Sequence, residues 1–151
     1  MPVTIRSPTR EELSGLSDLC FRSKAVWRYD AAFMDACRDE LTFDQHELQS
    51  TSIAVAELGG NAIGVAQVKV VGSEAELLKL FVEPAALRKG IGRTLLNWAI
   101  EISSAKGAVR LTIDADPDAV PFYLRMGARR AGEAPSGSIP GRMLPRLIIE
   151  L

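Results

Sequence analysis

The sequence predicts a single α/β (α+β) domain over residues 1–151, and three observations support this. Residues 52–82 contain β-rich runs separated by glycine turns, and residues 90–106 show the apolar spacing of an amphipathic helix. Apolar residues make up 47% and charged residues 25%, which is ordinary for a globular protein. Because no repeat or linker interrupts the 151 residues, we expect one core.

The first third of the chain is expected to be helical after a short opening strand at residues 3–6. Thr9 is followed three residues later by Glu12, which is the spacing of a capping box at a helix start. Apolar side chains from Leu13 onward recur at helical spacing, and a second such pattern covers residues 30–38. Two helices are therefore predicted before the first long strand.

The middle and end of the chain predict a β-meander followed by alternating helices and strands. Runs at 53–58 and 62–71 flank a Gly-Gly-Asn turn, which is typical of a hairpin, and a third run covers 76–82. The remaining elements expected are a helix over 90–106, a strand over 109–113, a helix over 117–126, and strands over 128–131 and 143–151.

Charge and composition exclude several classes of function. Eighteen basic and nineteen acidic residues give a net charge of −1, so neither nucleic acid nor an anionic membrane is an expected partner. The first ten residues carry charges and two prolines, and no apolar run of about 18 residues occurs, so we expect a cytoplasmic protein. Cys20 and Cys37 are then expected as buried free thiols. His46, the single histidine, is expected at the surface, and no metal cofactor is predicted.

The loop Leu87 to Thr94 joins a strand to a helix and has the features of an anion site. Gly90 and Gly92 let a ligand approach the backbone, and the free N–H groups and dipole of the helix start favour negative charge. Positive charge is added by Arg88, Lys89 and Arg93. A P-loop string is absent, and Leu95 stands where a dinucleotide fingerprint needs its third glycine.

Two segments of the chain resemble motifs of the GNAT superfamily of acetyl-CoA-dependent N-acetyltransferases. Leu87-Arg88-Lys89-Gly90-Ile91-Gly92 is similar to the family's Gln/Arg-x-x-Gly-x-Gly/Ala motif, with leucine in the first position. The segment from Asp116 to Ala128 is similar to Asn-x-x-Ala-x-x-Phe-Tyr-x-x-x-Gly-Phe, with Asp116 replacing Asn and Ala128 replacing Phe. Together the matches cover residues 76–128, and the order of the other elements agrees with the family.

This resemblance implies a fold and a cosubstrate. The GNAT fold has a central mixed, mostly antiparallel sheet of six to seven strands, splayed between strands 4 and 5 and flanked by four helices. The resemblance implies acetyl-CoA, with its pyrophosphate on backbone N–H groups of the glycine loop and its pantetheine arm along strand 4. The cofactor-binding residues expected are Leu80, Phe81, Val82, Leu87, Arg88, Lys89, Gly90, Ile91, Gly92, Arg93, Thr94, Asp116 and Phe122.

The resemblance also suggests an acid and a base for acetyl transfer. Tyr123 matches the tyrosine that protonates the departing CoA thiolate in many members, and a phenol stays protonated at neutral pH. The alternative is that Tyr123 fills the core beside Phe122. Glu76, near the start of strand 4, is the candidate base, with Glu74 and Glu83 as alternatives. Many members of the family have no single essential base.

Residues 22–30 concentrate charged and aromatic groups between the first two predicted helices. We expect this stretch to bind the acceptor through Arg22, Lys24, Trp27, Tyr29 and Asp30. The alternative is a polar turn with its tryptophan anchored in the core. The loop 136–142 is expected either to close over the substrate or to be disordered.

The function predicted from sequence is N-acetyl transfer, by direct attack in a ternary complex. The expected acceptor is a primary amine of a small molecule, with a peptide or protein amine as a variant. The competing hypothesis is a non-catalytic module of the same fold that binds CoA or acyl-CoA. A homodimer is a possible assembly in this family.

Overall fold

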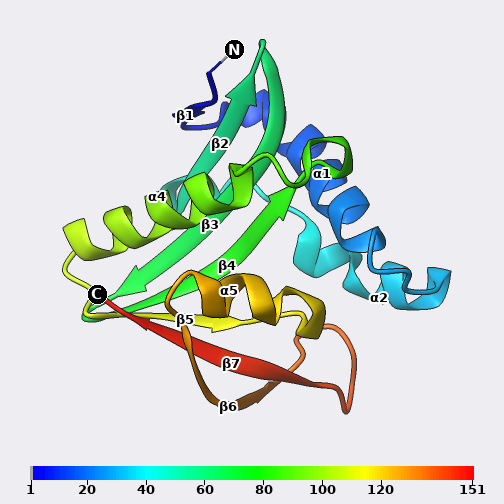
Figure 1. The fold of residues 1–151 in the computed structure, drawn as a ribbon. Helices are drawn as coiled ribbons and strands as arrows, with labels where there is room; N and C mark the ends of the chain where they lie inside the picture. Colours follow the sequence, from blue (N-terminus) through cyan, green and yellow to red (C-terminus); the bar gives the residue numbers. More distant parts are fainter. Residues whose placement is uncertain (1) are drawn as a thin grey trace.

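The computed structural model describes residues 2–151 and contains, within them, one sheet of seven strands in the order β1-β2-β3-β4-β5-β7-β6 (Figure 1). All neighbouring strands are antiparallel except β4 and β5, which are parallel. The expected mixed, mostly antiparallel sheet is therefore confirmed. The strands are β1 (Thr4–Arg6), β2 (Ser52–Leu58), β3 (Asn61–Val71), β4 (Glu74–Val82), β5 (Arg110–Asp114), β6 (Arg129–Pro135) and β7 (Met143–Glu150).

Five α-helices lie in the described part of the chain, one more than expected. They are α1 (Leu13–Ala25), α2 (Ala31–Leu41), α3 (Glu47–Ser50), α4 (Ile91–Ala105) and α5 (Val120–Arg125). The additional helix is α3, whose four residues are too few to produce an apolar repeat. Exposed His46 precedes it, so the prediction of a surface histidine is confirmed.

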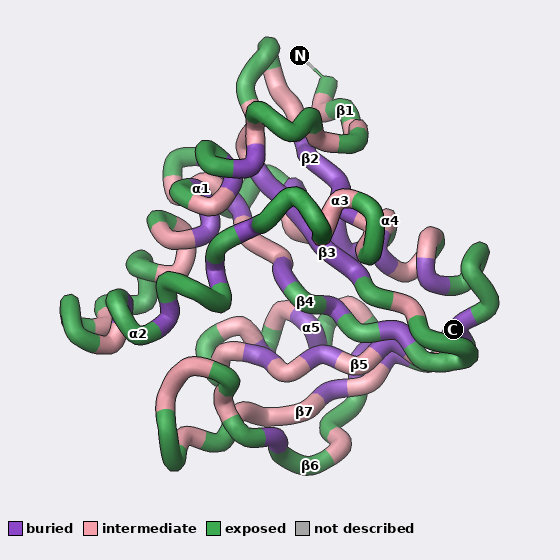
Figure 2. Tube along the Cα trace, turned by 180° about the vertical axis from the view of Figure 1, so that it is seen from behind, coloured by how far each residue is buried: buried purple, intermediate pink, exposed green. Residues whose placement is uncertain are grey.

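The helices cover both faces of the sheet. On one face, α1 and α2 pack with β2 and β3 around Leu16, Leu19 and Val55. On the other face, α4 and α5 share a core with β4, β5 and β7. Figure 2 shows the buried positions concentrated along the central strands, where both layers of helices meet the sheet.

The start of α1 follows from its local sequence. Thr9 and Glu12 form the expected capping box at the 3-10 turn Arg10–Glu12 that leads into α1, and the Thr9 N–H donates to the Glu12 carboxylate at 2.8 Å. Cys20 on α1 and Cys37 on α2 are buried and unpaired, as predicted. Burial among apolar side chains raises the pKa of the Cys20 thiol to about 12, so this sulfur remains a neutral core group.

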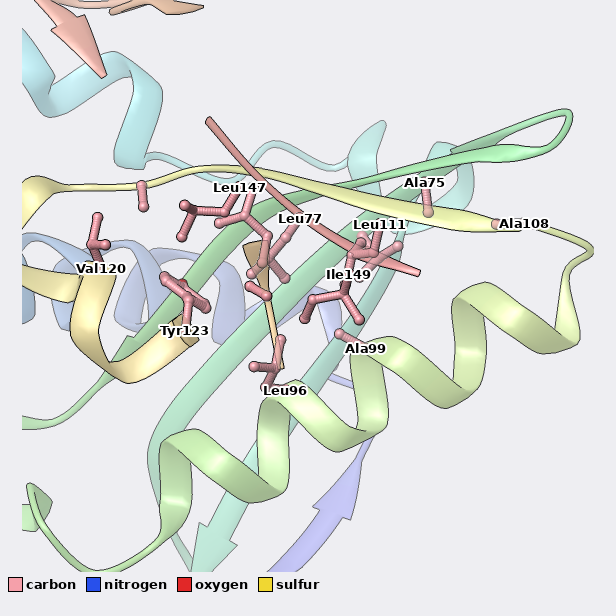
Figure 3. Packing of buried hydrophobic residues seen from close by; sticks show 14 residues of the cluster. Ala75, Leu77, Leu96, Ala99, Ala108, Leu111, Val120, Tyr123, Leu147 and Ile149 are labelled. Carbon is pink, nitrogen blue, oxygen red and sulfur yellow. The ribbon is translucent and has the colours of Figure 1, made fainter. Parts of the chain in front are cut away.

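The apolar face of α4 explains its position on the sheet. Figure 3 shows Leu96 and Ala99 among the buried side chains of the strands, including Leu111 and Ile149. Gly64 on β3 permits this close approach, because a Cβ atom there would lie 2.9 Å from a methyl group of Leu95. The helix therefore lies close enough to β3 for its first turn to reach the end of β4.

The sheet opens between β4 and β5, as expected from the GNAT resemblance. The two strands pair only from Glu74 with Arg110 to Glu76 with Thr112, and beyond this point they diverge (Figure 1). A register shift between Gln67 and Val68 of β3 lies opposite the point where β4 leaves β5. The rest of β4 thus pairs with β3 alone.

None of the helices among residues 2–151 is long and apolar enough to cross a membrane. The cytoplasmic location and the homodimer stay predictions.

Candidate active site

A cavity of about 700 Å³ opens where β4 and β5 diverge. Its walls come from β4, the glycine loop, the end of β5 and α5, and it extends to the α1–α2 and β6–β7 connections. A volume of this size is usual for a small-molecule site. Of the residues predicted from sequence, those lining it are Lys24, Trp27, Leu80, Phe81, Val82, Leu87, Arg88, Gly90, Ile91, Gly92, Arg93, Asp116, Phe122 and Tyr123.

The glycine loop ends in an uncapped helix start. Gly90 is the N-cap of α4 with φ of 78°, a left-handed conformation that favours glycine, and it provides no side chain to cap the first turn. Arg88 also has a positive φ, of 66°. The Thr94 hydroxyl donates to the Gly90 carbonyl at 3.0 Å and lies outside the cavity lining, as does Lys89. The first turn therefore has N–H groups available for an anion.

Positive charge surrounds this end of the cavity. Arg88 and Arg93, which were expected to bind the cofactor, line it, and so does Arg125 at the end of α5. Sequence reasoning missed Arg125, because its position in the Phe-Tyr motif is a variable one. The ring of Phe122 lies 3.4 Å from where a Cβ of Gly92 would be, so α5 packs directly on the glycine loop.

Tyr123 belongs to both the core and the cavity. Its side chain is 6% exposed, and Figure 3 shows its ring near Val120 and the buried cluster under α4. It also lines the cavity, and the Phe122 ring meets it edge-on at 5.1 Å. Burial raises the pKa of the Tyr123 phenol above its ordinary value of about 10, so the hydroxyl is protonated at neutral pH.

The three glutamates considered as bases lie outside the cavity lining. Glu76 is exposed and belongs to the part of β4 that pairs with β5. Glu74 forms an ion pair with Arg110 at 3.2 Å. Glu83 accepts two hydrogen bonds from Arg22, at 2.9 and 2.7 Å, which lower the pKa of its carboxyl. The role of Glu76 stays a prediction.

A polar cluster joins three connections at the other end of the cavity. The Tyr29 hydroxyl donates to Asp116 at 2.5 Å and accepts from Arg142 at 2.9 Å. The Lys24 Nζ atom lies 3.6 Å from the Asp116 carboxylate, and Arg142 lies 3.8 Å from it. The Tyr29 ring stacks on Phe33 at 3.9 Å between ring centroids. Asp116 thus contacts two of the residues predicted for the acceptor, Lys24 and Tyr29.

The predicted acceptor stretch divides into lining and supporting residues. Lys24 and Trp27 line the cavity, and Trp27 is 43% exposed, so it is not anchored in the core. Tyr29 does not line the cavity, but its hydroxyl donates to Asp116, which does. Arg22 instead holds Glu83, and Asp30 caps α2 by accepting from the Phe33 N–H at 2.8 Å. Neither Arg22 nor Asp30 lines the cavity, because each side chain is engaged outside it.

Among the lining residues that sequence reasoning missed are Arg142, Glu40 and Lys79. Arg142 lies in the loop 136–142, which is ordered by a backbone hydrogen bond from Ser136 N–H to the Arg142 carbonyl at 2.8 Å. Glu40 on α2 accepts from the Ser138 hydroxyl and so ties the same loop to α2. Lys79 on β4 is 7% exposed and donates to Gln67 at 3.0 Å, 3.8 Å from Glu47.

Comparison with known proteins supports this geometry. The sequence model of the acetyltransferase (GNAT) family matches residues 16–128, which include β2 to β5, the glycine loop and Tyr123. The chain belongs to this family. Membership in the GNAT family makes it an acyltransferase, and it confirms the resemblance stated from the two motifs.

Relatives of this GNAT protein include several bacterial and archaeal acetyltransferases. A curated spermidine N(1)-acetyltransferase from Thermoplasma acidophilum is 26% identical over 120 residues, covering 71% of this chain and 74% of the relative. The PaiA N-acetyltransferase of Thermoplasma acidophilum, solved in complex with coenzyme A, is 22% identical over the whole of both chains, with a TM-score of 0.80. A GCN5-related N-acetyltransferase from Rhodopseudomonas palustris is also 22% identical, with 98% and 95% coverage and a TM-score of 0.82.

Proposed function

We propose that this GNAT protein transfers the acetyl group of acetyl-CoA to a primary amine of a small molecule, by direct attack in a ternary complex. The observation that carries the proposal is the continuous cavity between the diverging strands β4 and β5. It runs from the uncapped start of α4 to Tyr123 and on to the polar cluster around Asp116. One end suits a pyrophosphate and the other a polar acceptor.

The cosubstrate fits the two sides of this cavity. Its pyrophosphate would accept hydrogen bonds from the N–H groups at the first turn of α4, near Arg88 and Arg93. Its pantetheine arm would follow Leu80 to Val82, where β4 has lost its pairing with β5 and can offer backbone groups to a ligand. In this arrangement acetyl-CoA would be bound mainly by backbone groups of α4 and β4.

The chemistry exchanges one bond for another. The amine nitrogen attacks the thioester carbonyl, a C–N bond forms, the C–S bond breaks, and the thiolate of CoA departs. Tyr123 would donate its proton to that sulfur, for which its protonated phenol at the cavity wall is suited. The proton lost by the nitrogen can then restore the phenol through solvent.

The acceptor amine must lose a proton before it can attack. A free alkylamine has a pKa of about 10, so fewer than about 1 in 100 molecules are neutral at pH 7. Because Glu76 lies outside the cavity lining, it would act only through intervening water. We propose that the ammonium form loses one proton to Glu76 through water, and that the neutral amine then attacks.

The test is release of free CoA thiol from acetyl-CoA across a panel of primary amines. Acetyl transfer predicts thiol release that depends on the amine, together with one acetylated product per thiol. The competing hypothesis of a non-catalytic CoA-binding module predicts binding of CoA with no amine-dependent release. The curated relative named for spermidine makes that polyamine one member of the panel.

A further inference from the structure

We propose, building on the function above, that the acceptor amine also carries a carboxylate, and that Arg142 and Lys24 bind this group. These two cations lie at the end of the cavity away from the glycine loop and both line it. The proposal assigns a role in acceptor choice to Arg142, in the connection between β6 and β7, and it names the chemical class of the acceptor.

Both cations have hydrogen-bond donors without partners among residues 2–151. Lys24 Nζ lies near Asp116 at 3.6 Å, beyond hydrogen-bond distance, although its side chain is only 16% exposed. Arg142 donates from Nη2 alone, to the Tyr29 hydroxyl, and its side chain is 20% exposed. An ammonium has three N–H donors and a guanidinium five, so both side chains keep donors that are available to an anion in the cavity.

Asp116 does not satisfy both cations. One of its carboxylate oxygens accepts from the Tyr29 hydroxyl and the other from the Asp118 N–H at 3.1 Å. Two positive charges therefore face one carboxylate whose oxygens are already engaged. Three other carboxylates line the cavity: Asp114 is paired with Arg146 at 2.8 and 3.0 Å, while Glu40 and Asp118 are exposed, so water screens their charge.

Aromatic rings hold the two cations in place. Lys24 Nζ lies 5.5 Å from the centroid of the Tyr29 ring, and the Arg142 guanidinium lies 4.9 Å from that of Phe33. These contacts help to fix the positions of the two charges. The planar fork of a guanidinium matches the two oxygens of a carboxylate, which favours this anion as the bound group.

The same arrangement disfavours a polyamine. A second ammonium in the acceptor would lie close to Lys24 and Arg142, where like charges repel and little water is present to screen them. The acceptor class inferred for this chain therefore differs from the polyamine in the name of its curated relative.

Matched pairs of acceptors test the proposal. Glycine, β-alanine and 4-aminobutanoate are each compared with their carboxamides, with spermidine as a further acceptor, by CoA thiol release. We expect at least one acid to exceed its amide tenfold or more in kcat/KM and to exceed spermidine. Arg142→Gln should reduce kcat/KM for that acid by tenfold or more and so remove the preference for the acid over its amide, while CoA affinity stays within about twofold.

Arg130→Gln is the matched control, because Arg130 is an exposed arginine on β6 outside the cavity lining. It should keep the wild-type preference. Equal use of acids and amides, or a preference for spermidine, overturns the inference while leaving acetyl transfer intact. Absence of thiol release with every amine contradicts the proposed function itself.

Discussion

Replacing Tyr123 by phenylalanine removes one hydroxyl from the wall of the cavity and leaves the buried ring in place. The side chain is 6% exposed and packs in the core shared by α4, α5, β5 and β7, so phenylalanine fills nearly the same volume. We expect the free energy of unfolding to change by less than about 1 kcal/mol. Loss of a general acid lowers kcat by about 10²-fold or more, which corresponds to about 2.7 kcal/mol of transition-state stabilisation.

The assay is steady-state CoA release with the preferred amine, beside calorimetric titration with CoA. Tyr123→Phe should lower kcat while CoA affinity stays within about twofold. Because burial raises the pKa of Tyr123 above its ordinary value of about 10, the wild-type rate should rise with pH as the amine loses its proton, with no decline below pH 10. If the variant retains near wild-type turnover when chemistry limits the rate, Tyr123 is only a core residue.

Three further predictions concern the loop and the fold. Gly64→Ala should reduce the free energy of unfolding by about 1–3 kcal/mol, since its Cβ would lie 2.9 Å from α4, whereas Gly15→Ala, with open space around it, should not destabilise the protein in urea titrations. Gly92→Val should weaken CoA binding tenfold or more by calorimetry, and unchanged affinity in a folded variant would refute the loop assignment. Hydrogen bonds from the Arg6 guanidinium lower the pKa of Glu12 to about 2, so the stability that this ion pair contributes is present above about pH 4.5 and lost as the pH falls towards 2. The free energy of unfolding of Glu12→Gln should therefore decrease less than that of the wild type over this interval, and an identical decrease would contradict this.

Local signals in the sequence were sufficient to predict most of the helices and strands. The capping box at Thr9 and the glycine at residue 90 each act within one turn of chain, so their consequences can be predicted from neighbouring residues. The helix expected over 117–126 is instead a 3-10 turn at Pro117–Ala119 followed by α5, because two prolines shorten the regular part. The register shift between β3 and β4, where Leu78 has no partner on β3, was not predicted from the sequence.

The acceptor end of the site could be predicted only in part. Tyr29 contacts Asp116, which is 87 residues away along the chain, and Arg142, which is 113 residues away. Contacts between residues this far apart in the sequence cannot be predicted from local residue spacing. The loop 136–142 has the glycine and serine content of a flexible segment, yet Arg142 is fixed by tertiary contacts. Trp27 is exposed at the cavity rather than anchored in the core, because it lies in the turn directly after the C-terminal end of α1.

The position of bound CoA tests the central claim most directly. A crystal structure of the complex should place the pyrophosphate within hydrogen-bond distance of backbone N–H groups between Arg88 and Arg93. The pantetheine arm should lie between β4 and β5, with the sulfur near the Tyr123 hydroxyl. A pyrophosphate bound away from the start of α4, or a pantetheine arm outside the opening between β4 and β5, would contradict the account.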